Sequence, residues 1–403
     1  MVFWGEEGGH RSGACQYDLS PEVYSRNLSL LENKKNDIYP ESCQATSMLP
    51  ELFSTQAFSR KVLNKSLADG TLIKVGRGHV IKPLNTPDKW KRIRHVKLGQ
   101  IASHALRCNT PPIYIGVTAA MLHGLAATSP RTDTAIHTAG HHFEKKLLPA
   151  WIDLDTSSGQ PIRTPMPPTP LICHKIDVSK DNTKYLGHHL RVTDLATTTL
   201  HCTAWLATEN AQAIADSAAK KLITGWETAN RSKQQTLLKQ IPHLQAQMTN
   251  LGNKYCNKTG AAQAREILAN MDPRFESYAE SLLHLASRLA QVKGLIPQFE
   301  VKVSAAQSYY LDAAIPKFRT AFEIDGMQKY HSADPEQTYA AIQGEKSRQS
   351  QLQKLGWHIY RFTYEDVSDV FGFANFLRSR LGTAWDGVSI PPWYRLRNSR
   401  LNR

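Results

Sequence analysis

The segment from Leu295 to Val367 constrains the fold most, because strand-like and helix-like stretches alternate there in a fixed order. The runs QFEVKV, YYLDAAIP and TAFEIDG are rich in β-branched and aromatic residues, which predicts three successive strands. The stretch EQTYAAIQGEKSRQSQLQKLG predicts a long helix that ends at Gly356, and WHIYRFT predicts another strand. Together these elements predict a mixed sheet flanked by helices, so we assign the chain to the α/β class (α+β overall).

Three carboxylates lie within or at the end of strands of this predicted sheet. Asp312 falls inside the second strand, and Glu323 and Asp325 flank Ile324 at the end of the third. Side chains two residues apart share one face of a strand, and a neighbouring strand can bring Asp312 close to both. Because three such carboxylates would repel one another, we expect them to bind Mg²⁺, which takes carboxylate oxygens and can activate a water molecule.

An ion pair gives a simpler explanation for a carboxylate inside an apolar strand. An unpaired buried carboxylate is costly, and Lys346 and Arg348 of the long helix could each neutralise Glu323 or Asp312. Spacing alone leaves both alternatives open.

The stretches DAAIPKFRTAFEIDGMQKYH and GEKSRQSQLQKLGWHIYRFTYEDV resemble the domain related to the very-short-patch-repair endonuclease, within the PD-(D/E)xK superfamily. This resemblance implies a restriction-endonuclease-like domain over residues 272–381 with Mg²⁺-dependent DNA cleavage. It implies catalytic and metal-binding roles for Asp312 and Glu323, and it makes Glu280 a candidate for the acid that an upstream helix often supplies. Lys346 and Arg348 belong to an E-K-x-R pattern and are expected to contact DNA.

The chain departs from the superfamily pattern at Asp325, where a lysine usually stands. Lys329 could supply the missing ammonium, with Lys346 as the competing candidate; otherwise the domain is catalytically silent. Glu280 also has a structural alternative, because Ser277 and Glu280 have the spacing of a helix capping box.

Residues 48–84 predict an N-terminal winged-helix domain. The segment MLPELFSTQAF begins a helical pattern, SRKVLNKSLADG predicts a helix with its apolar residues on one face and Gly70 at its end, and TLIKV and HVIKP flank a Gly-Arg-Gly turn. The alternative is a solvated basic helix beside an ordinary hairpin. The residues expected to contact DNA are Arg60, Lys61, Asn64 and Lys65 on the helix, and Lys74 and Arg77 on the wing.

The upstream half resembles the AbiEi family of type IV antitoxin regulators. The resemblance rests on the order of a winged helix, TAAMLHGL and LRVTDLATTTL. It implies an α/β middle domain over residues 85–231, a role in transcriptional regulation and a cognate toxin as partner.

The remaining segments complete the predicted organisation. Residues 1–47 are expected to be a poorly ordered extension, with Met48 as a candidate start, and residues 161–170 a proline-rich loop. Residues 232–271 predict a helical connector, and residues 382–403 a basic tail. The histidines interpreted as structural or surface residues, because they lack metal-ligand spacing, are His123, His174, His188, His189 and His201.

Charge supports a polyanionic partner. The 403 residues include 49 Lys plus Arg against 35 Asp plus Glu, a net charge of +14, which favours DNA. The six cysteines are scattered without Cys-x-x-Cys spacing, and no run of about 20 apolar residues is present. We therefore expect a cytoplasmic protein with reduced thiols and no membrane partner.

Overall fold

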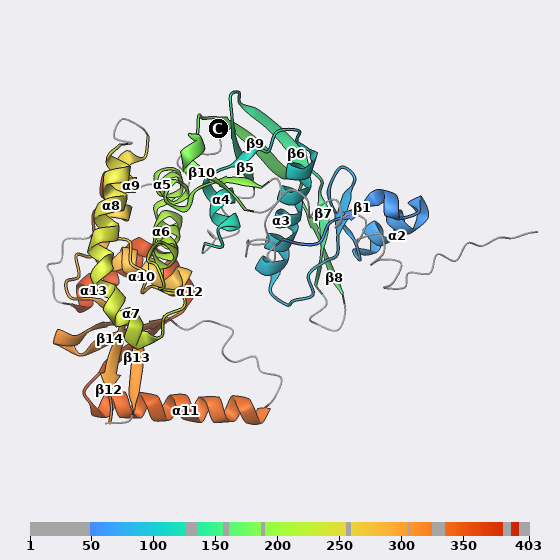
Figure 1. Ribbon diagram of the computed structural model, residues 1–403. Helices are drawn as coiled ribbons and strands as arrows, with labels where there is room; N and C mark the ends of the chain where they lie inside the picture. The colour runs from blue at the N-terminus through green and yellow to red at the C-terminus, as the bar shows by residue number, and fades with distance from the viewer. Residues whose placement is uncertain are drawn as a thin grey trace, which may run out of the picture. The chain divides into compact units, whose positions relative to one another are not determined.

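The computed structural model describes residues 49–125, 135–155, 161–186, 190–254, 259–304, 307–324, 335–381 and 388–394, without the side chains of 335–342 (Figure 1). All of these residues belong to one unit, residues 45–403. Helices are combined with mixed sheets, which confirms the predicted α/β class. None of the described helices is long and apolar enough to cross a membrane.

The N-terminal part forms a small three-stranded sheet and one exposed helix. The strands β1 (Phe53–Ser54), β3 (His79–Ile81) and β2 (Ile73–Gly76) lie in that order, and β2 and β3 form the predicted antiparallel hairpin. Helix α2 (Arg60–Asp69) begins after Ser59, whose hydroxyl accepts a hydrogen bond from the Val62 N–H, and ends at Gly70 with φ 81°.

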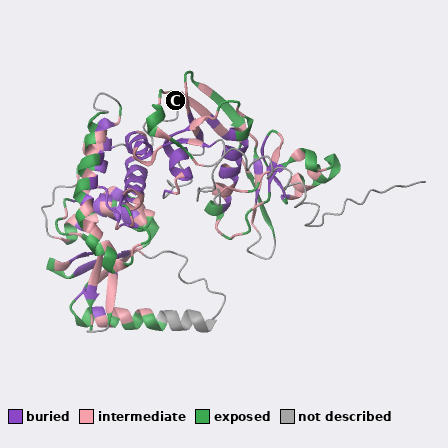
Figure 2. Cartoon of the chain, viewed as in Figure 1, coloured by how far each residue is buried: buried purple, intermediate pink, exposed green. Residues whose placement is uncertain are grey.

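Two details of this region differ from the prediction. The segment expected to begin a helix forms β1 and the short 3₁₀ helix η2 (Thr55–Ala57) instead. Helix α2 buries none of its residues (Figure 2), and Val62 is 46% exposed. The apolar face expected to pack inside a winged helix is therefore not buried against the described residues, and the winged helix stays a prediction.

Helix α3 (Lys89–Arg107) packs on the hairpin and also on a strand further along the chain. Val96 of α3 packs with Val75 and Ile81 of the hairpin and with Trp151 of β7 (Trp151–Asp155). Buried Arg92 of α3 binds Asp153 of β7 with hydrogen bonds of 2.8 and 3.1 Å. Charge pairing and apolar packing thus join α3 to β7.

The predicted proline-rich loop at residues 161–170 is wrong, because the segment forms strands. Among the described strands, β8 (Ile162–Met166) pairs with β7 alone, and β9 (Thr169–Lys175) begins at the end of the segment. Pro170 pairs with Leu147 on one side, whereas the pairing of β9 with β5 begins one residue later, at Leu171. Proline is tolerated at position 170 because a residue that has a partner strand on one side needs no N–H donor on its other side.

A six-stranded mixed sheet forms the middle of the chain. Its order is β10-β11-β4-β5-β9-β6. The elements not yet given are β4 (Ile113–Tyr114), α4 (Gly116–Leu122), β5 (Ile136–Gly140), β6 (Glu144–Leu148), η3 (Lys180–Asn182), β10 (Thr183–Tyr185) and β11 (Arg191–Thr193).

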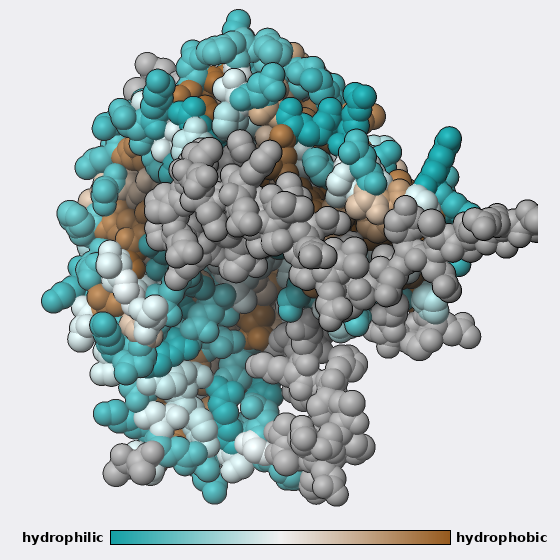
Figure 3. Space-filling model, turned by 45° about the vertical axis from the view of Figure 1, so that its right-hand side comes forward, coloured by the Kyte–Doolittle hydropathy of each residue, from teal (hydrophilic) through white to brown (hydrophobic). Residues whose placement is uncertain are grey.

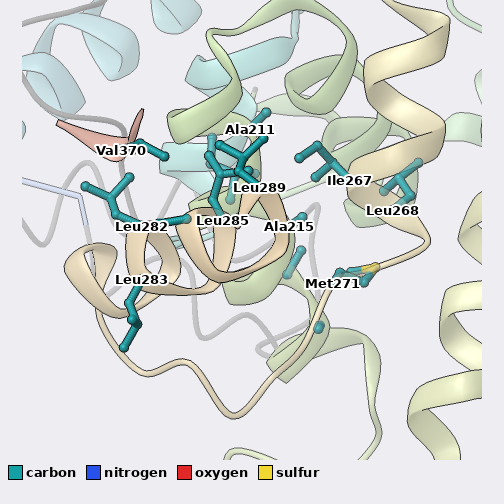
Figure 4. Packing of buried hydrophobic residues seen from close by; sticks show 14 of the residues in the cluster. Ala211, Ala215, Ile267, Leu268, Met271, Leu282, Leu283, Leu285, Leu289 and Val370 are labelled. Atoms are coloured by element: carbon teal, nitrogen blue, oxygen red, sulfur yellow. The ribbon is translucent and has the colours of Figure 1, made fainter. Parts of the chain in front are cut away.

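A helical layer follows, consisting of α5 (Leu195–Trp205), α6 (Thr208–Leu222), α7 (Arg231–Leu237), η4 (Leu238–Gln240), α8 (Ile241–Asn253), α9 (Ala261–Leu268) and α10 (Tyr278–Leu289). These helices share one hydrophobic cluster with α13 (Val370–Arg380), in which Ala211, Ile267, Leu285 and Val370 are among the buried members (Figure 4). The cluster crosses the predicted boundaries at residues 231/232 and 271/272, so the connector helices contribute to the same core as the C-terminal region.

Hydrophilic residues cover most of the described surface in Figure 3.

The C-terminal sheet has the predicted strands and helix. The strands β12 (Ile296–Lys302), β13 (Ser308–Ile315), β14 (Thr320–Ile324) and β15 (His358–Phe362) lie in sequence order, with η5 (Pro316–Phe318) between β13 and β14. Helix α11 (Pro335–Lys354) makes the crossover that allows β14 and β15 to run parallel, while the other neighbours are antiparallel. One side of the sheet packs on Leu352 of α11, and the short helix α12 (Tyr364–Ser368) leads into α13.

Candidate functional site

Asp312 lies where strands β13 and β14 part. The registered pairs between these strands run from Ile315↔Thr320 to Ala313↔Phe322 and stop one residue before Asp312. Beyond that point, the Asp312 carboxylate accepts a hydrogen bond of 2.8 Å from the backbone N–H of Ile324. The Asp312 side chain thus accepts a backbone hydrogen bond beyond the last paired residues, and this bond fixes the carboxylate between the two strands.

Glu323 is buried and paired with two arginines. Its side chain lies 2.5 Å from the guanidinium of Arg348 on α11 and 3.5 Å from that of Arg361 on β15. Both arginines also bind Glu345 of α11, and Arg348 donates to the Tyr310 carbonyl at 2.9 Å. The ion-pair alternative is thereby confirmed for Glu323 and Arg348, and Arg348 would have to leave these partners to contact DNA.

The pKa of Glu323 reflects these opposing surroundings. Burial raises the pKa, the positive charge of Arg348 lowers it, and the negative charge of Asp312 raises it. The net direction is upward, so two arginines do not fully compensate the burial of this carboxylate.

Glu280 lies near the start of α10, where it does hold the helix terminus. The Ser277 hydroxyl accepts from the Glu280 N–H at 3.1 Å, and the Glu280 carboxylate accepts from the Glu276 N–H at 2.9 Å. In the predicted capping box the Glu280 carboxylate would accept from the N–H of Ser277, whereas here it accepts from the N–H of the preceding residue, Glu276. Burial, together with the negative charge of Asp312, raises the pKa of Glu280 to about 6.

Gln298 connects Glu280 to the sheet. Its amide donates to the Glu280 carboxylate at 3.3 Å. It lies opposite Asp312, between the registered pairs Pro297↔Ala313 and Phe299↔Leu311, and its φ of 51° is unusual for a strand residue. Nothing in the run QFEVKV indicated this conformation, so sequence reasoning missed Gln298.

The structure therefore relates one predicted acid, Asp312 of β13, to two others, Glu280 of α10 and Glu323 of β14. The negative charge of Asp312 raises the pKa of Glu280 and also that of Glu323. Asp325 and Lys329 lie outside the described residues. Lys346 is exposed on α11, whereas Glu345 and Arg348 of the same helix reach the sheet.

The donor set suits a hard divalent cation, since Mg²⁺ is commonly held by one or two carboxylates with water and substrate phosphates as further ligands. Within the described ranges, no three His, Cys, Asp or Glu side chains are arranged to hold a metal ion. A cation at Asp312 and Glu323 would need water and substrate phosphate as its other ligands.

The residues predicted to contact DNA in the N-terminal region are all accessible. Exposed positions are Arg60, Lys61, Asn64 and Lys65 on α2, and Lys74 and Arg77 on the β2–β3 hairpin. Arg77 lies in the turn between Gly76 and Gly78, so its side chain projects from the tip of the hairpin. These groups provide a basic, solvent-facing surface.

The described histidines have structural contacts. His123 lies 2.8 Å from the Thr193 carbonyl, and burial lowers its pKa to about 4. His174 lies 2.8 Å from His137, and the ring of His201 stacks on Trp205. His188 and His189 fall outside the described residues.

Comparison with known proteins gives no relative: no family model, no curated protein and no solved structure matches this chain. The two resemblances noted in the sequence therefore stay predictions.

Proposed function

We propose that this chain binds DNA and that its C-terminal region hydrolyses phosphodiester bonds with a divalent cation such as Mg²⁺. The observation that carries the proposal is Asp312, held by the Ile324 N–H where β13 and β14 part, whose negative charge raises the pKa of Glu280 and that of Glu323. A carboxylate whose charge raises the pKa of two buried neighbours favours a cation beside it, because a cation relieves both the repulsion and the cost of burying the charges.

The residues have separable roles in this proposal. Asp312, held by the Ile324 N–H, and Glu323 would be the metal ligands, with Asp325 as the further ligand expected from the sequence. Such a cation would supply an activated water and would stabilise charge on the phosphate. Glu280, with a pKa of about 6, can take up or release a proton near neutral pH.

The basic surface would hold the polyanion. Exposed lysines and arginines on α2 and the hairpin can contact phosphates, and the net charge of +14 promotes association with DNA. These contacts would position DNA without selecting a sequence.

A second function is favoured by the arginine pairing of Glu323. A carboxylate already bound by Arg348 and Arg361 has less need of a metal ion, as expected for a silent nuclease-like domain. In that case the chain would be a DNA-binding regulator of the AbiEi-like antitoxin type, with a toxin as partner.

Cleavage assays distinguish the two functions. Linear and supercoiled DNA would be incubated with the full chain in Mg²⁺ or Mn²⁺, and binding would be measured in parallel without divalent cations. The nuclease proposal expects cleavage that Glu323→Gln abolishes while DNA affinity is unchanged. DNA binding without cleavage in either metal would refute it and support the regulator.

A further inference from the structure

A cavity of about 260 Å³ lies beside the candidate site, between α7 and strands β12 and β13. Its walls include Trp226, Arg231, Arg274, Gln298, Phe299 and Tyr310. The volume lies just below the roughly 300–1,000 Å³ of ordinary small-molecule sites. One ring-sized group fits such a space better than an extended cofactor.

The cavity adjoins the carboxylates through two shared residues. Gln298 lines the cavity and donates to the Glu280 carboxylate at 3.3 Å. Tyr310 also lines it, lies two residues before Asp312 on β13, and accepts through its carbonyl from Arg348, which binds Glu323. A molecule in the cavity would therefore lie close to the proposed cleavage point.

The lining combines aromatic rings with amides and guanidinium groups. Tyr310 offers a ring on which a flat ring can stack, and the amides of Gln234 and Gln298 can both donate and accept hydrogen bonds. Stacking is sequence-tolerant because every base has a π-face. These groups match an unpaired nucleobase better than an aliphatic ligand.

Arg231 supplies the charge that a phosphate needs. Its guanidinium carbon lies 5.3 Å from the centre of the Tyr310 ring, and its side chain is 41% exposed. It pairs with Glu276 at 2.8 Å, but both partners are solvent-exposed, so exchanging this carboxylate for a phosphate costs little.

We propose that this cavity binds one unpaired nucleotide of the DNA strand to be cut, with its base against Tyr310 and its phosphate at Arg231. The inference rests on the proposed function, since it names the substrate class of the same site as single-stranded DNA. A duplex would have to release a nucleotide from its stack before that nucleotide could enter.

Photocrosslinking tests the cavity without requiring catalysis. An oligodeoxythymidine carrying one 5-iododeoxyuridine would be irradiated with the full chain in EDTA, and crosslinked peptides would be mapped by mass spectrometry. We expect crosslinks at Trp226 or Tyr310. Tyr310→Leu should weaken oligonucleotide binding roughly 5- to 150-fold, because a stacking ring is lost.

A neighbouring tyrosine provides the matched control. Tyr309 precedes Tyr310 on β13 but contacts Gln351 and Arg348 of α11, so Tyr309→Leu should keep the crosslinks. Arg231→Gln serves as a second variant on an exposed side chain and should also weaken binding. Unchanged affinity in both Tyr310→Leu and Arg231→Gln, or crosslinks only elsewhere, would overturn the inference.

Failure of the cavity and failure of the nuclease proposal are distinguishable. Metal-dependent DNA cleavage without crosslinks at Trp226 or Tyr310 would remove the cavity as a nucleotide site and leave the nuclease standing. Crosslinks at these residues without cleavage in any metal would keep the cavity and refute the nuclease.

Discussion

Replacing Glu280 by glutamine should stabilise the folded chain at neutral pH. Glu280 is 7% exposed, and its carboxylate accepts hydrogen bonds from the Glu276 N–H and the Gln298 amide. A glutamine oxygen can accept the same bonds while removing the buried negative charge beside Asp312. The substitution therefore isolates the cost of that charge.

The magnitude follows from the pKa, which rises from 4.5 to about 6 on folding. Each pKa unit corresponds to about 1.4 kcal/mol, so the ionised carboxylate costs about 2 kcal/mol above pH 6. The folded state binds the proton more tightly, and this contribution to stability is therefore lost as pH rises from about 4.5 through about 6. Glu280→Gln should be more stable by up to about 2 kcal/mol at pH 7.5, with little difference near pH 4.5.

Urea unfolding at pH 7.5 and pH 4.5 measures this difference. Glu51→Gln, on an exposed side chain, is the control and should change neither value. A Glu280→Gln protein that is equally destabilised at both pH values would refute the reasoning, because it would show that the carboxylate acts mainly as a helix cap.

Two further predictions concern other charged groups. Arg92→Met should destabilise the fold by about 3–5 kcal/mol in urea unfolding, because Asp153, which is 3% exposed, would be left buried without its arginine. Adding Asp153→Leu should recover most of this loss. Full stability of the Arg92→Met protein would contradict the prediction. Replacing Lys61, Lys65 and Arg77 together by glutamine should lower the slope of log affinity against log salt by about 3 for duplex DNA, and an unchanged slope would place the DNA contacts elsewhere.

The C-terminal sheet could be predicted because its local signals agree. Apolar runs of strand length alternate with one long helical stretch, and Gly356, with φ 81°, ends the helix where the sequence places it. The pairing of Glu323 with Arg348 could also be predicted from the sequence, as one of two alternatives. Arg361 was not, because its contact with Glu323 depends on the parallel register of β14 and β15.

The two wrong predictions in the N-terminal and middle parts of the chain have one cause, because both depend on contacts between segments that lie apart in the sequence. Whether proline interrupts a strand depends on whether that strand has a neighbour on the side of the missing N–H, and local composition does not contain this information. Pro165 lies in a two-stranded ribbon and Pro170 at a strand end, so both are accommodated. Likewise, the segment MLPELFSTQAF suggested a helix, but its Leu52 packs against the hairpin and its Phe53 pairs with Val80 of β3.

Direct measurement of cation binding tests the central claim. Mn²⁺ would be titrated into the full chain in the presence of a single-stranded oligonucleotide, and free Mn²⁺ would be followed by electron paramagnetic resonance. The account predicts bound Mn²⁺ that is lost in Asp312→Asn and retained in Asp177→Asn, whose side chain is 94% exposed. Equal Mn²⁺ binding by the wild type and Asp312→Asn, or none by the wild type, would contradict a metal site at the parting of β13 and β14.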